Sequence, residues 1–273
     1  MSKTGIEYLD LGWNPIAMRC TPCSEGCQKC WHLRMAGRLA ANPTIPVDVR
    51  DAYAGKVPPM LLQERLEEPL RRKKPARIGV EFMGDLFCET VPTEYIAAVL
   101  KVAAACKQHT FVILTKRAKR MAELCGFWWG WELKRGYLDN VWFGVTVENQ
   151  KRADERIPLL LQIPAAVRWV SYEPALGPVD FTYITADAVG RDALRVDAPN
   201  CVTGSPEHHL DWVILGAETG PGARPMDPAW ARDVRDQCQK AGVPFFYKRG
   251  SDGSRLLDGQ KWEQWPKREV ADD

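Results

Sequence analysis

The residues best suited to chemistry are four cysteines in one short stretch of the chain. Residues 19–31 read R-C-T-P-C-S-E-G-C-Q-K-C-W and contain Cys20, Cys23, Cys27 and Cys30. Separations of two, three and two residues let one loop direct several thiolates at one inorganic centre. The stretch therefore predicts a metal loop, and leaves open which centre it binds and through which cysteines.

The spacing of the cysteines favours an iron-sulfur cluster over structural zinc. Zinc sites usually use two C-x-x-C pairs about 12 or more residues apart, whereas three residues separate Cys23 from Cys27. Iron-sulfur clusters accept compact loops, and three cysteines that bind three irons leave a fourth iron open to a small molecule. The run Cys23-x3-Cys27-x2-Cys30 has the spacing typical of radical S-adenosylmethionine (SAM) enzymes.

Composition predicts an intracellular protein without a membrane partner. The 273-residue chain has 37 basic and 35 acidic residues, so no global field draws it to nucleic acid or to a membrane. It has no long apolar run, and its N-terminus lacks the apolar core of a signal peptide. Thiols stay reduced inside cells, so nine cysteines favour metal or redox chemistry. The five outside the loop are predicted to be small buried hydrophobic residues: Cys88, Cys106, Cys125, Cys201 and Cys238.

The elements that must position the loop follow from an alternation of short apolar runs with helical segments. This pattern predicts an α/β fold, a full or partial (β/α) barrel with parallel strands and outer helices, in a single domain over 1–273. A surface excursion at about 42–76 and an insertion or lid at about 182–210 interrupt it. The predicted strands are 78–83, 110–114, 141–147, 167–171, 212–216 and 244–248, and the predicted helices are 31–41, 93–107, 117–125, 151–162 and 228–241.

Polar residues follow the predicted strands, where a barrel carries its functional groups. Each one alone is explained by a helix cap or a surface ion pair. Their repetition at one edge of the sheet favours an active site. They are Gly84 with Asp85, Lys116 with Arg117, Glu148 with Asn149, Glu173, Glu218 and Lys248.

Several phrases link the chain to a known family. They include M-G-D-L-F at 83–87, W-F-G-V-T-V-E-N at 142–149 and S-Y-E-P-A-L-G-P at 171–178. The chain resembles the phage gp-thirty-seven/gp-sixty-eight domain family, whose members are described as radical-SAM-like. The family spacing C-x6-C-x2-C maps onto Cys20, Cys27 and Cys30. Two triads therefore compete, and we favour Cys20 as the third ligand, with Cys23 as its alternative.

The resemblance implies a 4Fe-4S cluster and S-adenosyl-L-methionine, which would be cleaved to a 5'-deoxyadenosyl radical. Gly84 and Asp85 stand where such enzymes bind the methionine amino group, and Glu148 or Asn149 would bind the ribose hydroxyls. The catalytic candidates are Glu173, Glu218 and Lys116, and the candidate anion contacts are Lys116, Arg117, Arg224 and Lys248.

A phage setting implies a substrate and partners. The expected reaction is an isomerase-type rearrangement, or another radical modification, of a nucleotide or modified thymidine in DNA hypermodification. An electron donor such as flavodoxin or ferredoxin would act with the enzyme in the cytoplasm of an infected or lysogenic host.

Two alternatives remain open at the level of sequence. One is a non-enzymatic phage protein in which the cysteines hold structural zinc or an iron-sulfur site. The other is a metal-independent nuclease or glycosidase that uses the acids and leaves the cysteines idle.

Overall fold

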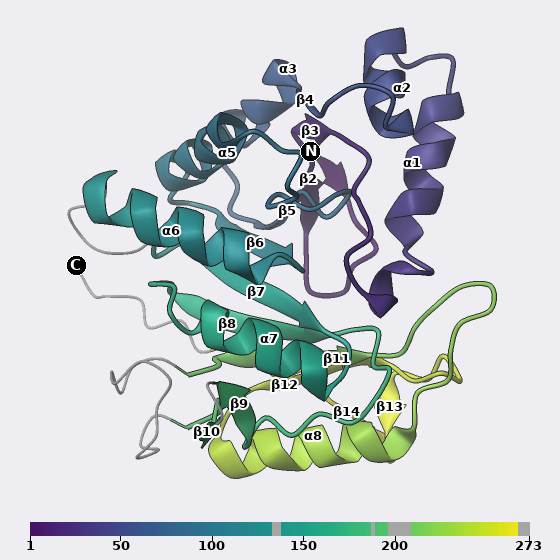
Figure 1. Ribbon diagram of the computed structural model, residues 1–273, viewed down its shortest axis with the longest axis vertical. Helices are drawn as coiled ribbons and strands as arrows, with labels where there is room; N and C mark the ends of the chain where they lie inside the picture. Colours follow the sequence, from purple (N-terminus) through teal and green to yellow (C-terminus); the bar gives the residue numbers. More distant parts are fainter. Residues whose placement is uncertain (133–137, 187–188, 196–208, 267–273) are drawn as a thin grey trace. The chain divides into compact units, whose positions relative to one another are not determined.

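The protein is a mixed α/β structure built on a large, mostly parallel sheet. The computed structural model describes residues 1–132, 138–186, 189–195 and 209–266 (Figure 1). The strands of the main sheet are β1 (Ser2–Lys3), β2 (Leu11–Trp13), β5 (Arg77–Val80), β6 (Thr110–Thr115), β7 (Val141–Val147), β8 (Val167–Tyr172), β11 (Trp212–Gly216) and β12 (Phe245–Arg249). Their order is β1-β2-β5-β6-β7-β8-β11-β12.

The sheet falls short of the predicted barrel in one respect. Strands β2, β5 and β6 pair in parallel, as do β8, β11 and β12, whereas β1 is antiparallel to β2. The edge strands are β1 and β12, and within the described residues no pairing joins them to close a barrel. The parallel α/β architecture is therefore confirmed, while closure is not seen.

Helices connect the strands, and the described residues also form three small sheets. The helices are α1 (Trp31–Ala41), α2 (Val47–Ala54), α3 (Gln63–Leu66), α4 (Glu68–Arg71), α5 (Thr93–Ala105), α6 (Ala118–Glu132), α7 (Gln150–Leu160) and α8 (Pro228–Ala241), with a 3-10 turn, η1 (Glu25–Cys27). The small sheets pair β3 (Ile16–Ala17) with β4 (Met60–Leu61), β9 (Ile184–Ala186) with β10 (Val189–Arg191), and β13 (Leu256–Leu257) with β14 (Gln260–Lys261). In the described chain no helix has the length and apolar character needed to cross a membrane.

The chain divides into two compact units. Unit 1 comprises Met1–Gly144 with Pro164–Ala166, and unit 2 comprises Val145–Ile163 with Val167–Asp273. The single domain expected from the sequence stays a prediction beside this division.

The predicted elements match closely where their boundaries have a local cause. Helix α8 begins where the Asp227 carboxylate accepts from Ala229 N at 2.8 Å, and it ends at Gly242, whose φ of 73° is left-handed. Strand β5 ends at Val80, three residues before the predicted end, because Glu81 has a φ of 53°. A residue with positive φ cannot continue a β-strand.

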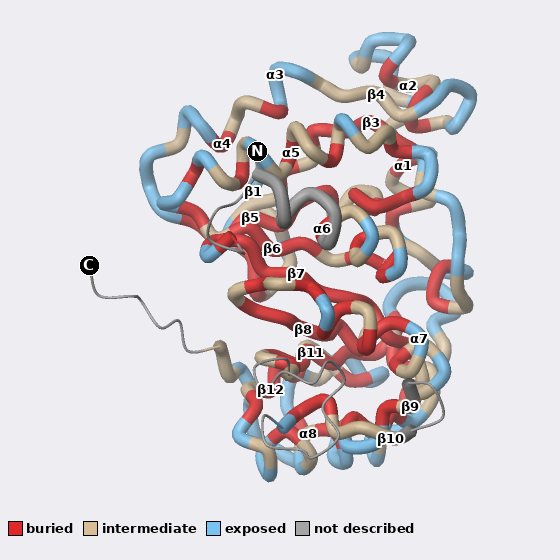
Figure 2. Tube along the Cα trace, turned by 60° about the vertical axis from the view of Figure 1, so that its left-hand side comes forward, coloured by how far each residue is buried: buried red, intermediate tan, exposed pale blue. Residues whose placement is uncertain are grey.

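The core lies along the central strands, which are buried along their length (Figure 2). All residues of β7 and β8 are buried, as expected for parallel strands covered on both faces. In unit 2 the Trp169 and Trp212 rings pack 5.8 Å apart.

Both interruptions predicted from the sequence contain regular elements. The 42–76 excursion forms α2, β4, α3 and α4, and Val49, Ala52 and Tyr53 of α2 pack on Ala17 in a small core. Figure 1 shows α2 beside α1. The described part of 182–210 includes the antiparallel pair of β9 and β10, and β9 contacts α7. Residues 196–208, with Cys201, lie outside the described chain.

Candidate functional site

The cysteine loop lies in unit 1, between β3 and α1. Its second half is wound tightly, since Cys27 N donates to Ser24 O at 3.0 Å and Cys30 N donates to Cys27 O at 3.2 Å. Cys30 stands directly before α1, which begins at Trp31. The loop follows parallel strand β2, so its thiols are carried to the carboxyl edge of the unit 1 strands.

The four loop thiols are free of disulfides and fall into two groups. Cys27 shares a hydrogen bond with Cys23, and its Sγ lies 3.7 Å from Ser24 Oγ. The Cys23 hydrogen bond lowers the pKa of Cys27 to about 4, against the opposing effect of burial, so Cys27 is a thiolate at neutral pH. Cys20 instead faces Cys88, from another part of the chain. Over the described residues no three His, Cys, Asp or Glu side chains are gathered as a metal-binding group.

The Arg117 side chain forms several hydrogen bonds around Cys20. Its Nη1 donates to Cys20 Sγ at 3.3 Å and to Asp85 Oδ2 at 2.9 Å. Its Nη2 donates to both the carbonyl and the hydroxyl oxygen of Thr21, and its Nε donates to Glu89 Oε2 at 3.2 Å. The side chain is only 5% exposed. Burial opposes its charge, but Asp85 and the neighbouring thiols raise the pKa of Arg117 above its usual value.

Asp85 joins the loop to the ends of two strands. Its Oδ1 accepts from Thr115 Oγ1 at 2.6 Å and from Phe87 N at 3.0 Å. Its Oδ2 accepts from Arg117 and from Lys116 N, the latter at 3.1 Å. These bonds fill the roughly four lone-pair positions of a carboxylate. The structure thus brings Asp85, Arg117 and Cys20 together, and it holds Asp85 rigidly.

Gly84 is required by close packing beside Asp85. A Cβ at this position would lie 2.7 Å from Met18 Sδ and 3.3 Å from Glu81 Oε1. Any larger residue would push Met18 away from the strand end.

Cys88 is buried as predicted, but it is more than a small hydrophobic residue. Its Sγ lies 3.6 Å from Thr21 Oγ1 and 3.4 Å from Thr90 Oγ1. The hydrogen bond between Cys20 and Cys88 lowers the pKa of Cys88 to about 3 and, with burial, raises that of Cys20.

Two residues near the loop were missed in the sequence. His32 accepts from Cys20 N through Nε2 at 3.1 Å, and burial lowers its pKa to about 4, so the ring is neutral. Glu81 is fully buried, with Oε2 accepting from Ile16 N at 3.1 Å and Oε1 unpartnered. Burial raises the pKa of Glu81 to about 8. A histidine two positions after Cys30 was a usable signal, whereas Glu81 was hidden inside a predicted strand.

The candidate residues of unit 2 have partners of their own. Glu148 is buried and accepts from Arg156 Nη1 at 3.0 Å, while Asn149 caps α7 by accepting from Arg152 N at 3.1 Å. Both oxygens of the Glu173 carboxylate accept from Lys248 Nζ at 2.8 Å.

Glu218 and Arg224 form a further pair in unit 2. The Glu218 carboxylate accepts from Arg224 Nε at 2.9 Å and from the backbone N of Arg224 at 2.8 Å. Three of the four predicted anion contacts, Arg117, Arg224 and Lys248, are thus paired with carboxylates. The fourth, Lys116, helps lower the pKa of Cys27 through its charge.

Fold and site together define a mixed α/β protein with a thiol-rich loop at the carboxyl edge of parallel strands. The chain belongs to the family described as "Protein of unknown function (DUF5131)", whose model matches residues 3–266. No curated protein and no solved structure matches the chain significantly.

Proposed function

We propose that the protein is a radical SAM enzyme whose 4Fe-4S cluster is held by Cys20, Cys27 and Cys30. The observation that supports this most is the buried Arg117, which bonds both Cys20 of the loop and Asp85. Thiolates are the usual protein ligands of such clusters, and the loop offers free thiols, one of them a thiolate at neutral pH. The loop therefore supplies donors of the type that such a cluster takes, and binding would have to draw Cys20, Cys27 and Cys30 together, since the described residues do not gather them as a metal-binding group.

The same proposal includes a barrel of the radical-SAM type. Strands β2, β5 and β6 are parallel, and they lead to the cysteine loop, Asp85 and Arg117 respectively. Functional groups of β/α barrels occupy this edge.

The residues around the loop have separable tasks. Asp85 orients the guanidinium group of Arg117 through a hydrogen bond. Arg117 bonds the side chain of Cys20, and His32 bonds its backbone N–H. Because the oxygens of Asp85 are already engaged, we assign it a positioning role ahead of direct contact with the methionine amino group. A bound and reduced cluster would supply the electron that cleaves SAM to a 5'-deoxyadenosyl radical.

The test is anaerobic reconstitution of the full chain with iron and sulfide, followed by dithionite and SAM. We expect bound iron and sulfide, and 5'-deoxyadenosine in the products. Stoichiometric zinc with no SAM cleavage after reconstitution would instead favour a structural metal site.

Single cysteine variants identify the ligands in the same assay. Cys27→Ala and Cys30→Ala should each abolish iron retention, and so should Cys20→Ala, whereas Cys23→Ala should spare it. Cys106→Ala is the matched control, because Cys106 is a buried free thiol outside the loop. Iron loss in Cys23→Ala with retention in Cys20→Ala would reverse the choice of third ligand.

The proposal also covers the substrate and the electron donor. A nucleotide or modified thymidine remains the expected substrate, with flavodoxin or ferredoxin as electron donor. A substrate phosphate would have to compete with Glu173 for Lys248, or with Glu218 for Arg224.

A further inference from the structure

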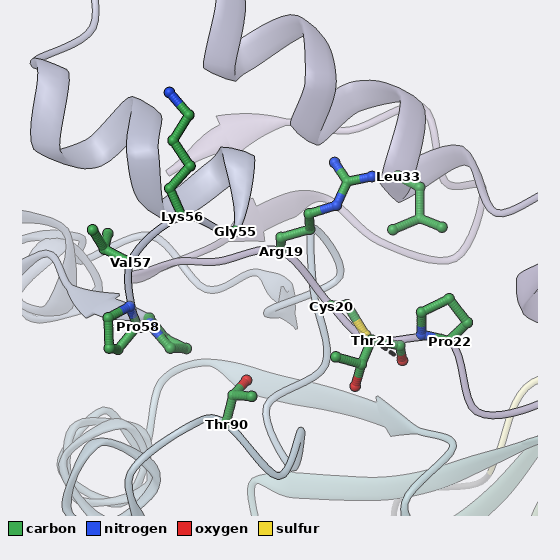
Figure 3. A pocket seen from close by; sticks show the side chains of 11 residues that line it. Arg19, Cys20, Thr21, Pro22, Leu33, Gly55, Lys56, Val57, Pro58 and Thr90 are labelled. Atoms are coloured by element: carbon green, nitrogen blue, oxygen red, sulfur yellow. Dashed lines mark hydrogen bonds between the residues drawn. The ribbon is translucent and has the colours of Figure 1, made fainter.

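A pocket in unit 1 lies beside the cysteine loop. Its volume is about 650 Å³, within the range of ~300–1,000 Å³ that is typical of small-molecule sites. Figure 3 shows that its walls come from separate parts of the chain, namely residues 19–22, residues 55–58, Leu33 of α1 and Thr90. The pocket therefore has the size of a small-molecule site.

The walls of this pocket are held in place by the fold. Gly55 ends α2 with a left-handed φ of 75°, which fixes the direction of the chain that follows. On another wall, Arg117 Nη2 donates to Thr21 Oγ1 at 3.1 Å. The rings of Pro58 and Pro59 further restrict the backbone. A ligand would meet walls that are already formed, which lowers the cost of ordering them on binding.

Two cationic side chains lie together at the edge of the pocket. Arg19 crosses Gly55 so closely that a Cβ there would lie 3.0 Å from Arg19 Cδ, and Lys56 directly follows Gly55. Figure 3 shows both side chains on the side of the pocket opposite Thr90. Lys56 Nζ donates to Asp51 at 3.1 Å, but Lys56 is 71% exposed, and such exposed pairs are weak. The described residues that line the pocket include no acidic side chain, so its charge favours an anion.

Apolar side chains form much of the remaining wall. Figure 3 shows Val57 and Pro58 on one side of the pocket and Pro22 on another, with Leu33 beside Arg19. Val57 is 40% exposed, so part of this apolar surface is open to solvent. A ligand that covered it would gain from the burial of apolar surface. The pocket therefore suits a molecule with an anionic end and an apolar group.

We propose that this pocket binds a small phosphate monoester that carries an apolar group. The Arg19 guanidinium group would bind two phosphate oxygens, Lys56 would add a second positive charge, and Val57 and Pro58 would pack against the apolar group. A phosphate monoester carries a charge of about −1.5 to −2 at pH 7, so it matches two cations better than a carboxylate does. This inference goes beyond the proposed function and does not depend on a bound cluster.

The test is isothermal titration calorimetry with phenyl phosphate as the probe. The full chain is reduced and stripped of metal with a chelator before the titration. We expect phenyl phosphate to bind about tenfold or more tightly than phenol, because charge-assisted hydrogen bonds contribute at least this much. It should also bind more tightly than inorganic phosphate, which lacks the apolar group, and than benzoate, which carries one charge.

Variants of the two cations locate the anionic end of the ligand. Arg19→Gln should weaken the binding of phenyl phosphate about tenfold, because glutamine keeps part of the side-chain stem but loses the charge. Lys56→Gln should weaken it less, since Lys56 is exposed. Lys119→Gln is the matched control, because Lys119 is 83% exposed and does not line the pocket. This control should bind phenyl phosphate as the wild type does.

A further variant tests the apolar wall without removing a cation. Val57→Asp places a negative charge in the pocket and should abolish the binding of phenyl phosphate. Val47→Asp changes another exposed valine, which does not line the pocket, and should leave binding unchanged. Thermal unfolding of each variant verifies that it is folded.

Four results would each overturn the inference. They are the absence of binding by phenyl phosphate, equal affinity for phenol, equal affinity for benzoate, and unchanged binding in Arg19→Gln, Lys56→Gln and Val57→Asp. Absence of 5'-deoxyadenosine after reconstitution would contradict the proposed function but leave these affinities unchanged.

Discussion

At the residue scale, Glu81 combines burial with a strained backbone beside the candidate site. It is a fully buried carboxyl with positive φ and one unpartnered oxygen. Positive φ in a non-glycine residue costs on the order of 1–3 kcal/mol and collects at functional positions. The unpartnered Oε1 lies close to Gly84, so the strain is stored next to the Asp85 turn.

Glu81 should make stability depend on pH. Burial raises its pKa from 4.5 to about 8, so the folded protein keeps a proton that the unfolded chain releases above pH 4.5. Its contribution is fully present below pH 4.5 and is lost as pH rises towards 8, by up to about 1.4 kcal/mol per pH unit. Urea unfolding at pH 5 and pH 8 should show Glu81→Gln losing less stability over this range than the wild type.

The control for this experiment is Glu67→Gln, which changes an exposed carboxyl paired with Arg71. It should follow the wild-type pH dependence. Equal slopes for wild type and Glu81→Gln would show that Glu81 titrates normally in the folded protein.

At the element scale, the site depends on three chain segments that follow parallel strands. The loop holding Cys20 follows β2 and β3, Asp85 follows β5, and Arg117 follows β6. Arg117, which follows β6, bonds both of the other segments, and its planar guanidinium group permits this where a lysine ammonium does not.

Arg117→Ala should therefore loosen the loop as well as destabilise the fold. Removing one partner of a buried ion pair costs about 3–5 kcal/mol, because Asp85 is left charged and buried. Arg117→Lys keeps the charge and should recover part of the stability, but less of the iron retention. Urea unfolding and iron analysis measure the two effects separately.

The comparison variant is Arg71→Ala, since Arg71 is 65% exposed and pairs with exposed Glu67. It should cost under about 1 kcal/mol and leave iron retention intact. Full iron retention in Arg117→Ala would show that the loop binds iron without the hydrogen bonds of Arg117.

The sequence predicted the elements better than the site. Helices α1 and α8 and strands β7 and β11 have their predicted bounds, because apolar periodicity and caps such as Asp227 and Gly242 are local signals. The contact of Arg117 with Cys20 spans 97 positions and depends on packing that no local pattern encodes. The predicted burial of Cys88 is confirmed, but its contacts with Thr21 and Thr90 could not be read from the sequence for the same reason.

At the scale of the whole molecule, the near balance of charge limits the electrostatic attraction of a charged substrate. With a formal charge of +2, and with Arg117, Arg224 and Lys248 paired to carboxylates, no strong field attracts a polyanion.

We therefore expect weak binding to unmodified duplex DNA, with a Kd above about 1 μM at physiological salt. Fluorescence anisotropy of a labelled duplex measures this, and a free nucleotide serves as competitor. Nanomolar binding to random sequence would contradict the charge argument.

The placement of Cys20, Asp85 and Arg117 within unit 1 also has a consequence for biosynthesis. All of them leave the ribosome before most of unit 2 has been translated. Within the described residues, the side-chain hydrogen bonds of Arg117 go to residues that precede it in the chain, so the surroundings of Cys20 can assemble on the nascent polypeptide. Iron that reaches the loop during translation would then meet these contacts before the C-terminal half of the chain exists.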